Sequence, residues 1–300
     1  MKKNVVVLDA DGCMYLTPTA AIPVLEDAID MSMLHLLESK KNYPKYLETI
    51  ARLDTMFQDF DKTKLGVNFH NANHESKEGG SAEANLVAGR KFSELMNPQN
   101  VSKKDAEKMR LIAARALLKM LPPSTPRNHR VSAMINLEPE FGINTSHIAD
   151  FYRKYATIDY GAYGIKRNPA IEKVIQEARQ RGDAIGIYTD NSAENGIQIA
   201  KALGYNPKMF DFVYDMFDTG LTKKNDRGWE NFQAFLEKRY GPDFDCKRVR
   251  FYDDNQLICA TAEKNGIVSF VVTPDKVTRA VQKPKTNTTV LTAVKGRLGR

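Results

Sequence analysis

The sequence predicts an α/β protein in which a long helical segment interrupts a parallel sheet after its first strand. Three observations predict this fold class: a short apolar run at residues 5–8, strands and helices that alternate from residue 160 onward, and helical periodicity in the residues between. Strands that alternate with helices imply a parallel sheet with right-handed crossovers. We therefore expect a sheet domain assembled from two separated pieces of chain.

The first predicted strand is a run of apolar residues that leads directly into Asp9, Ala10, Asp11 and Gly12. Such a run is typical of a strand buried on both faces, and open α/β sheets bind ligands at the carboxyl ends of their strands. Side chains two apart on a strand point the same way, so the spacing predicts that Asp9 and Asp11 share one small space. Two crowded carboxylates require a cation or a shared proton. The competing interpretation is a surface turn, because Asp-x-Asp-Gly is a common turn composition.

The segment after the first strand has the periodicity of helices. Apolar residues recur at helical spacing over residues 22–58, and a second amphipathic stripe covers residues 102–121, where a pair of prolines ends it. A shorter helix is predicted over residues 145–155. We interpret residues 20–158 as one mostly helical module.

A polar stretch within this module contains His70 and His74, which would meet on one face of a helix as metal ligands. The sequence offers no convincing third ligand beside them, so we favour a polar loop. From such a loop Asn71, Asn73 or His74 would contact a substrate.

The α/β pattern resumes at Tyr160 with a helix whose two ends are marked in the sequence. Asn168 is a good N-cap, Pro169 suits the first helical position, and Gly182 ends the helix. The remaining strands are predicted over residues 185–189, 210–214, 249–253 and 267–272, and the remaining helices over residues 193–203 and 228–239.

Polar residues follow two of these strands and occupy a loop between them. They are Thr189, Asp190 and Asn191 after the second strand, Lys223 and Lys224 in the loop, and Asp253 and Asp254 after the strand at residues 249–253. An Asp-x-Asp pair, a threonine, a lysine and paired aspartates in this order resemble the four motifs of the haloacid dehalogenase (HAD) superfamily of phosphotransferases. The resemblance covers roughly residues 1–20 and 160–275.

The resemblance implies a Rossmann-like parallel sheet core with an inserted, mostly α-helical cap domain. We accordingly expect a discontinuous catalytic core at residues 1–20 and 159–275, a helical cap at residues 21–158 and a basic C-terminal tail at residues 276–300. A cap of this kind closes over the open edge of the sheet, excludes water and supplies substrate contacts.

The resemblance also implies roles for the first two motifs. Asp9 would be the nucleophile that forms an aspartyl-phosphate, and Asp11 would protonate the leaving oxygen and then deprotonate the attacking water. Thr189 would bind a phosphate oxygen, assisted by the N–H groups of the following residues, Asp190 and Asn191.

The other two motifs would bring positive charge to the phosphate, one through a lysine and the other through a metal ion held by aspartates. A lysine would neutralise the charge of the phosphate and restrain the nucleophile. In the family this lysine is usually followed by proline, whereas this chain reads Lys-Lys-Asn-Asp. Lys223 is favoured, and Lys224 stays open as the alternative. The implied cofactor is Mg²⁺, because hard oxygen ligands favour it over zinc. Its implied ligands are Asp9, the backbone carbonyl of Asp11 and Asp253, while Asp254 would act through water or orient its neighbours.

The function expected from these motifs is Mg²⁺-dependent hydrolysis of a phosphomonoester, with a small phosphorylated metabolite as substrate. A carboxylate at Asp11 suits an alkoxide or phenoxide leaving group, so a phosphatase is preferred to a dehalogenase, while the motifs leave a phosphomutase open. The alternatives are a protein phosphatase that acts on phosphotyrosine and a non-catalytic binding protein with the same fold.

Composition and charge set the broader class. With 42% hydrophobic and 27% charged residues and no apolar stretch near the roughly 20 residues of a membrane span, the 300-residue chain is typical of soluble globular proteins. We expect a cytoplasmic location, because no signal peptide is evident and the three cysteines lack disulfide or metal-ligand patterns. Secretion without a cleaved signal would leave no mark in the sequence.

The net charge of +7 equals the seven basic residues between residues 276 and 300, where no acid occurs. The neutral remainder argues against a nucleic-acid-binding face on the core. For the tail itself we favour a solvated end over a contact with nucleic acid, anionic lipid or an acidic partner.

Overall fold

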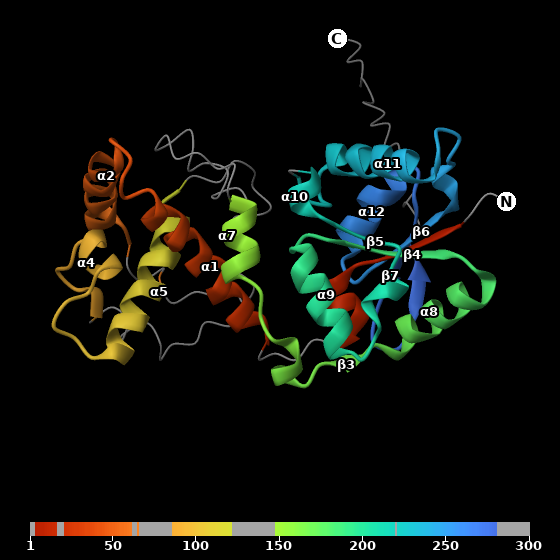
Figure 1. Cartoon of the computed structure of the whole chain (residues 1–300), viewed down its shortest axis with the longest axis horizontal. Helices are drawn as coiled ribbons and strands as arrows, with labels where there is room; N and C mark the ends of the chain where they lie inside the picture. The colour runs from red at the N-terminus through yellow and green to blue at the C-terminus, as the bar shows by residue number, and fades with distance from the viewer. Residues whose placement is uncertain are drawn as a thin grey trace, which may run out of the picture.

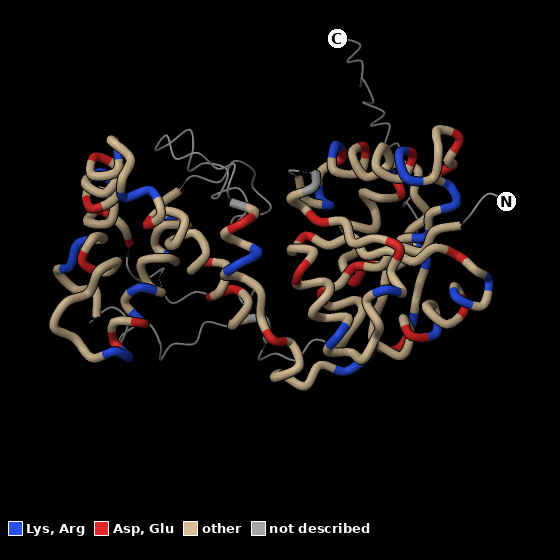
Figure 2. The backbone as a smooth tube through the Cα atoms, viewed as in Figure 1, with Lys and Arg blue, Asp and Glu red and all other residues tan. Residues whose placement is uncertain are grey.

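The computed structural model describes residues 4–16, 21–61, 65, 86–121, 148–219 and 221–280. Figure 1 shows a helical portion (described residues 21–156) beside a sheet portion (residues 4–16 and the described residues from 157 to 280). None of the helices in the described ranges is long and apolar enough to cross a bilayer. Acidic and basic residues are interspersed over both portions (Figure 2).

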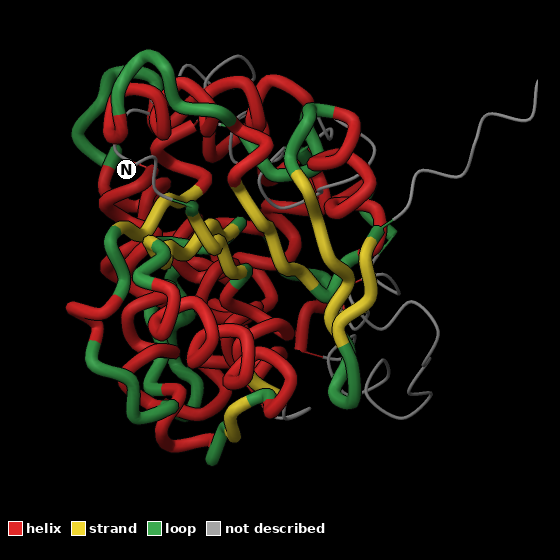
Figure 3. The backbone as a smooth tube through the Cα atoms, turned by 90° about the vertical axis from the view of Figure 1, so that its right-hand side faces the viewer, coloured by secondary structure: helices red, strands yellow, loops and turns green. Residues whose placement is uncertain are grey.

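The main sheet of the sheet portion contains six strands, and strands are drawn yellow in Figure 3. In spatial order they are β5 (Phe212–Asp215), β4 (Ala184–Thr189), β1 (Val5–Leu8), β6 (Val249–Asp253), β7 (Val268–Val272) and β8 (Val277–Arg279). The first five are parallel, and only β8 runs antiparallel to its neighbour. Leu8 lies opposite Ile187 of β4 and Tyr252 of β6, so the end of β1 is flanked by the ends of two other strands. The predicted α/β fold class is confirmed.

Helices cover both faces of the sheet. Helices α8 (Pro169–Arg181) and α9 (Ala193–Ala202) pack with Val6 and Leu8 on one face. Helices α11 (Asp226–Tyr240) and α12 (Gln256–Lys264) pack with Val5 and Val7 on the other (Figure 1). Because alternate residues of β1 enter different cores, the whole strand must be apolar, which explains the unbroken run in the sequence.

The predicted ends of α8 are confirmed. The Asn168 side chain accepts a hydrogen bond from Ala170 N at 3.1 Å, Pro169 is the first helical residue, and Gly182 ends the helix with φ of +70°. The predicted strand and helix positions elsewhere in the sheet portion agree with the structure to within two residues at each end.

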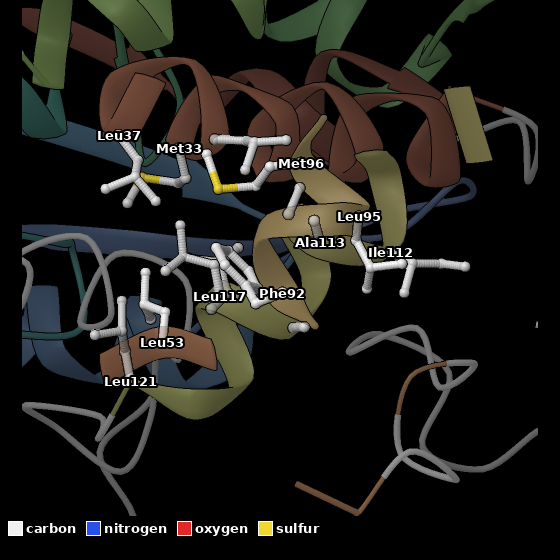
Figure 4. Close-up of a cluster of buried hydrophobic side chains, with 14 of the residues drawn as sticks. Met33, Leu37, Leu53, Phe92, Leu95, Met96, Ile112, Ala113, Leu117 and Leu121 are labelled. Atoms are coloured by element: carbon white, nitrogen blue, oxygen red, sulfur yellow. The ribbon is translucent and has the colours of Figure 1, made fainter. Parts of the chain in front are cut away.

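The helical portion has an apolar core of its own (Figure 4). Its helices are α1 (Ala21–Ser39), α2 (Tyr46–Asp59), α4 (Phe92–Met96), α5 (Lys103–Met120) and α7 (Ile148–Tyr155). The core residues labelled in the figure are Met33, Leu37, Leu53, Phe92, Leu95, Met96, Ile112, Ala113, Leu117 and Leu121. The helical pattern predicted over residues 22–58 divides into two helices, with turns at residues 40–45 between them.

The two portions touch through a few apolar side chains. Met216 of α10 (Met216–Thr219), which follows β5, is buried in the helical core, and Leu25 and Ala28 of α1 pack against the core of the sheet portion. The domain limits at residues 1–20, 21–158, 159–275 and 276–300 remain predictions.

Strand β8 departs from the expected solvated tail. Thr273 N donates to Lys276 O at 2.9 Å across a tight turn, and the β-branched Val277 and Thr278 then pair with β7. Residues 277–279 therefore belong to the sheet. The polar stretch with His70, Asn71, Asn73 and His74, and residues 281–300, lie outside the described residues.

Candidate active site

The main chain bends sharply where β1 ends. Asp9 N donates to Tyr252 O at 2.8 Å, which extends the pairing with β6 by one residue. The chain then enters a wide turn, η1 (Ala10–Met14), in which Gly12 has φ of +79°. Asp11 lies in this turn and not on the strand, so its side chain does not follow the strand alternation expected from the sequence. Asp9 and Asp11 are near each other but hydrogen-bond to different groups.

A buried lysine holds Asp9. Lys223 Nζ donates to Oδ1 of Asp9 and, at 2.7 Å, to Oδ2 of Asp253, and Lys223 is only 1% exposed. Its main chain is fixed as well: Lys223 N donates to Asp190 Oδ1 at 2.7 Å, and Lys223 O accepts from Trp229 Nε1 at 2.7 Å. The structure thus brings Lys223, and not the neighbouring Lys224, to Asp9.

Three carboxylates lie close together beside this ammonium group. Asp9, Asp253 and Asp254 each offer one oxygen, and these oxygens lie within 4.8 Å of one another. Burial raises the pKa of Asp9 well above its usual range, although Lys223 opposes the shift. Asp254 lies at the surface of the cluster, where partial desolvation and the charge of Asp253 raise its pKa to about 6. Desolvation alone would lower the pKa of Lys223, but Asp253 and Asp9 outweigh it and raise that pKa well above its usual value.

This cluster fits a hard divalent cation. It has more negative than positive charge, and all of its donors are carboxylate oxygens, which suit Mg²⁺ better than zinc. Gly12 permits the close approach of the turn, because a Cβ built there would lie 2.5 Å from Asp254 Oδ2. Sequence reasoning missed a role for Gly12, for which the glycine directly after Asp-x-Asp was the available signal.

The end of β4 carries the second motif. Thr189 Oγ1 accepts from Asn191 N at 3.0 Å, which leaves the hydroxyl proton for an incoming acceptor. The side chain of Asp190 is bonded to Lys223 N, and that of Asn191 is bonded to Asp11, Tyr160 and other protein groups. Thr189 is therefore the residue of this motif whose side chain has a donor to offer. The phosphate contacts of Asp190 and Asn191 were expected through their backbone N–H groups and remain predictions.

Asp11 is surrounded by hydrogen-bond donors that the sequence did not reveal. Its Oδ1 accepts from Tyr15 OH at 2.9 Å and from Tyr160 OH at 3.3 Å, and its Oδ2 accepts from Asn191 Nδ2 at 3.1 Å. Burial and the charge of Asp11 raise the pKa of both tyrosines far above the ordinary value, so both phenols remain protonated donors. Tyr15 belongs to β2 (Tyr15–Leu16), which pairs with β3 (Lys166–Arg167), and Tyr160 begins the helical turn η3 (Tyr160–Tyr163).

Comparison with known proteins gives structural neighbours only. No protein-family model matches the chain, and no curated protein matches it. Among solved structures it is similar to that of a putative β-phosphoglucomutase from Thermotoga maritima (12% identity, 94% of this chain and 88% of that chain, TM-score 0.39).

Two further structures give comparable values. CbbY from Rhodobacter sphaeroides in complex with phosphate is 12% identical over 95% of this chain and 92% of its own, with a TM-score of 0.37. The putative HAD-hydrolase YfnB from Bacillus subtilis, bound to magnesium, is 14% identical over 90% of this chain and 88% of its own, with a TM-score of 0.39. Identities and TM-scores this low assign neither an activity nor a substrate to this chain.

Proposed function

We propose that this chain is a Mg²⁺-dependent phosphomonoester hydrolase that acts through a phosphorylated Asp9. The observation that carries the proposal is the buried contact of Asp9 with Lys223 at the end of the central strand, beside Asp253 and Asp254. Burying charged groups destabilises the folded state unless they are paired. A cluster of three carboxylates with one ammonium group therefore lowers the stability of the fold, which is not expected in a protein where the cluster has no function. This favours an enzyme over a non-catalytic binding protein.

The first half of the reaction transfers the phosphoryl group to Asp9. Lys223 holds Oδ1 of Asp9, so the other carboxylate oxygen attacks phosphorus and forms an O–P bond. The bond from phosphorus to the ester oxygen breaks, and that oxygen keeps the electron pair and takes a proton from Asp11 to leave as the alcohol. The Thr189 hydroxyl donates to a phosphoryl oxygen during the transfer.

The second half restores the enzyme. A water oxygen attacks phosphorus and gives one proton to Asp11, and the Asp9–phosphorus bond breaks with its electron pair returning to the carboxylate. The products are the alcohol and inorganic phosphate, and Asp11 ends protonated as it began. Asp9, Asp253 and Asp254 would hold the Mg²⁺, with the carbonyl of Asp11 as a proposed further ligand; the ion would neutralise charge on the transferring group. The helical portion beside the sheet favours a small phosphorylated metabolite as substrate.

Hydrolysis of an aryl phosphate tests the proposal. We expect turnover in Mg²⁺, loss of turnover in EDTA and better recovery with Mg²⁺ than with Ca²⁺. Asp9→Asn should reduce kcat by at least about 10³-fold, because it removes the nucleophile. Asp226→Asn makes the same chemical change at the start of α11, where the residue pairs with Lys264, and should retain activity. More than a few per cent of turnover in folded Asp9→Asn, or binding of phosphate esters without any turnover by the unmodified chain, would contradict the proposal.

A further inference from the structure

We propose that Tyr152 and Asn191 are positioning residues for Asp11 and that they link helix α7 of the helical portion to the proton-transfer step. The inference rests on the proposed function. Tyr152 OH donates to Asn191 Oδ1 at 2.9 Å, and Asn191 Nδ2 donates to Asp11 Oδ2 at 3.1 Å. Tyr152 is 3% exposed and Asn191 is 5% exposed, so water competes weakly with either bond.

The orientation of the Asn191 amide is fixed by its neighbours. Its Oδ1 also accepts from Ser192 N and from Asn195 Nδ2, each at 2.8 Å. A backbone N–H can only donate, so the amide oxygen must face Ser192 and the amide nitrogen must face Asp11. With three donors at its oxygen and two acceptors at its nitrogen, this side chain has no capacity left for a phosphate. The geometry therefore points to a positioning role for this side chain, whereas the sequence predicted only that the backbone N–H of Asn191 assists phosphate binding.

Helix α7 is held against the sheet portion by more than this one bond. The Tyr152 ring packs edge-on against Phe217, with centroids 5.0 Å apart. Arg153 Nε lies 3.3 Å from Glu194 Oε2, and Arg153 Nη2 lies 3.6 Å from the buried Asp215. The link from Tyr152 to Asp11 thus starts from a helix whose place on the sheet portion is set by separate apolar and ionic contacts.

The chain directly after α7 is tied to the same cluster. Asn195 Nδ2 donates to Ala156 O at 2.8 Å, and Asn195 Oδ1 accepts from Ile158 N at 3.2 Å. Because Asn195 also donates to Asn191, the crossing from helical to sheet portion and the amide beside Asp11 belong to one network. A shift of α7 would therefore move the amide that orients Asp11.

The consequence concerns only substrates whose leaving group needs a proton. General acid catalysis contributes about 10²–10⁴-fold when the acid is correctly placed. Without the Tyr152 hydroxyl, Asn191 keeps its other two donors, so the link is loosened and not cut. Loss of such a bond corresponds to about five- to tenfold in rate. Asn191→Ala removes the donor to Asp11 itself and should cost more.

The experiment measures kcat/KM for three phosphate monoesters in Mg²⁺: 2,4-dinitrophenyl phosphate, whose phenolate leaves without a proton, phenyl phosphate, and a simple alkyl phosphate, whose alkoxide requires one. In Tyr152→Phe we expect the ratio of alkyl to dinitrophenyl kcat/KM to fall about five- to tenfold, with the dinitrophenyl value nearly unchanged. The ring contact with Phe217 remains in this variant. The matched control is Tyr155→Phe on the same helix, where the Tyr155 ring stacks on His35 with centroids 4.1 Å apart. In this control the ratio of alkyl to dinitrophenyl kcat/KM should equal that of the unmodified chain.

A fall of equal size for all three esters would show a merely structural role and would overturn the inference, as would an unchanged ratio. If Tyr152→Phe does not fold, Asn191→Ala carries the same test, and a selective loss with the alkyl ester supports the link. Absence of hydrolysis by the unmodified chain would instead remove the proposed function, so the two failures are distinguishable.

Discussion

Gly12→Ala separates the cost of an unusual backbone conformation from a specific effect on the carboxylate cluster. Gly12 has φ of +79°, and a Cβ built there lies 2.5 Å from Oδ2 and 2.9 Å from Cγ of Asp254. Ordinary contact requires about 3.5 Å, so the Asp254 carboxylate must retreat by about 1 Å. Because Asp254 is an exposed side chain, it can rotate away at little cost to the fold.

The expected magnitudes follow from a comparison with Gly182, which has φ of +70° and no atom within 4 Å of an added Cβ. In both variants alanine must adopt the left-handed conformation, which destabilises the folded state. The lower flexibility of the unfolded chain offsets part of this cost, so each variant should lose about 1 kcal/mol of unfolding free energy. Only Gly12→Ala displaces Asp254. Disturbing a group that supports or forms a metal site weakens metal affinity about 10- to 100-fold. The Mg²⁺ concentration needed for half-maximal effect, called here the Mg²⁺ requirement, should therefore rise by that factor in Gly12→Ala alone.

Two measurements check this prediction. Urea unfolding in EDTA gives the stability of each variant, and Mg²⁺ titrations of thermal stability and of aryl phosphate hydrolysis give the metal requirement. The reasoning is refuted if Gly12→Ala keeps the Mg²⁺ requirement of the unmodified chain, or if Gly182→Ala shows the same increase. A stability loss in Gly12→Ala far above that in Gly182→Ala would show that Asp254 cannot move aside.

Two further predictions concern the charges of the cluster. Lys223→Met leaves the carboxylates of Asp9 and Asp253 without their buried partner and should lower the unfolding free energy in EDTA by about 3–5 kcal/mol. Lys224→Met should change it by less than about 0.5 kcal/mol. Equal losses of the two variants in urea unfolding would contradict the assignment of Lys223. The pKa of Asp254 is raised from its ordinary value of 3.8 to about 6, so the folded state holds this proton more tightly and its contribution to stability must decline as pH rises from about 4 through about 6. Solvent screening of this exposed group limits the decline to less than about 1 kcal/mol, and Asp254→Asn should remove it. If the unfolding free energy of the metal-free unmodified chain instead rises relative to that of Asp254→Asn over this pH range, the raised pKa is refuted.

The features of the fold that the sequence predicted are those that local chemistry determines. The buried strand at residues 5–8 needs apolar residues on both faces, and the ends of α8 are fixed by Asn168 and Gly182 whatever the rest of the chain does. Parallel topology then places the ends of β1, β4 and β6 at one edge, which is why Asp9, Thr189 and Asp253 come together.

The features that were missed depend on the path of the chain in three dimensions. Asp9 and Asp11 were expected to point the same way, but the turn at Gly12 begins within two residues of the strand end and rotates Asp11 toward Tyr15 and Tyr160. No spacing in the sequence relates Tyr160 to Asp11, since 149 residues separate them.

The same holds for the loop residues. The choice between Lys223 and Lys224 depends on two hydrogen bonds that fix the main chain at Lys223: Trp229 Nε1 donates to Lys223 O, and Lys223 N donates to Asp190 Oδ1. Strand β8 depends on the free edge of β7, which the short segment at residues 277–279 does not reveal by itself.

Phosphorylation of Asp9 is the step on which the proposed function depends, and it can be observed directly. Acid quenching during turnover of an aryl phosphate, followed by borohydride reduction, converts an aspartyl-phosphate into homoserine, which mass spectrometry locates in the peptide that contains residues 4–16. We predict homoserine at position 9 with Asp11 intact, and none after the same treatment of Asp9→Asn. Turnover that continues with Asp9 unmodified at every quench time, or a phosphoryl group found on another residue, would contradict the assignment of Asp9 as the nucleophile.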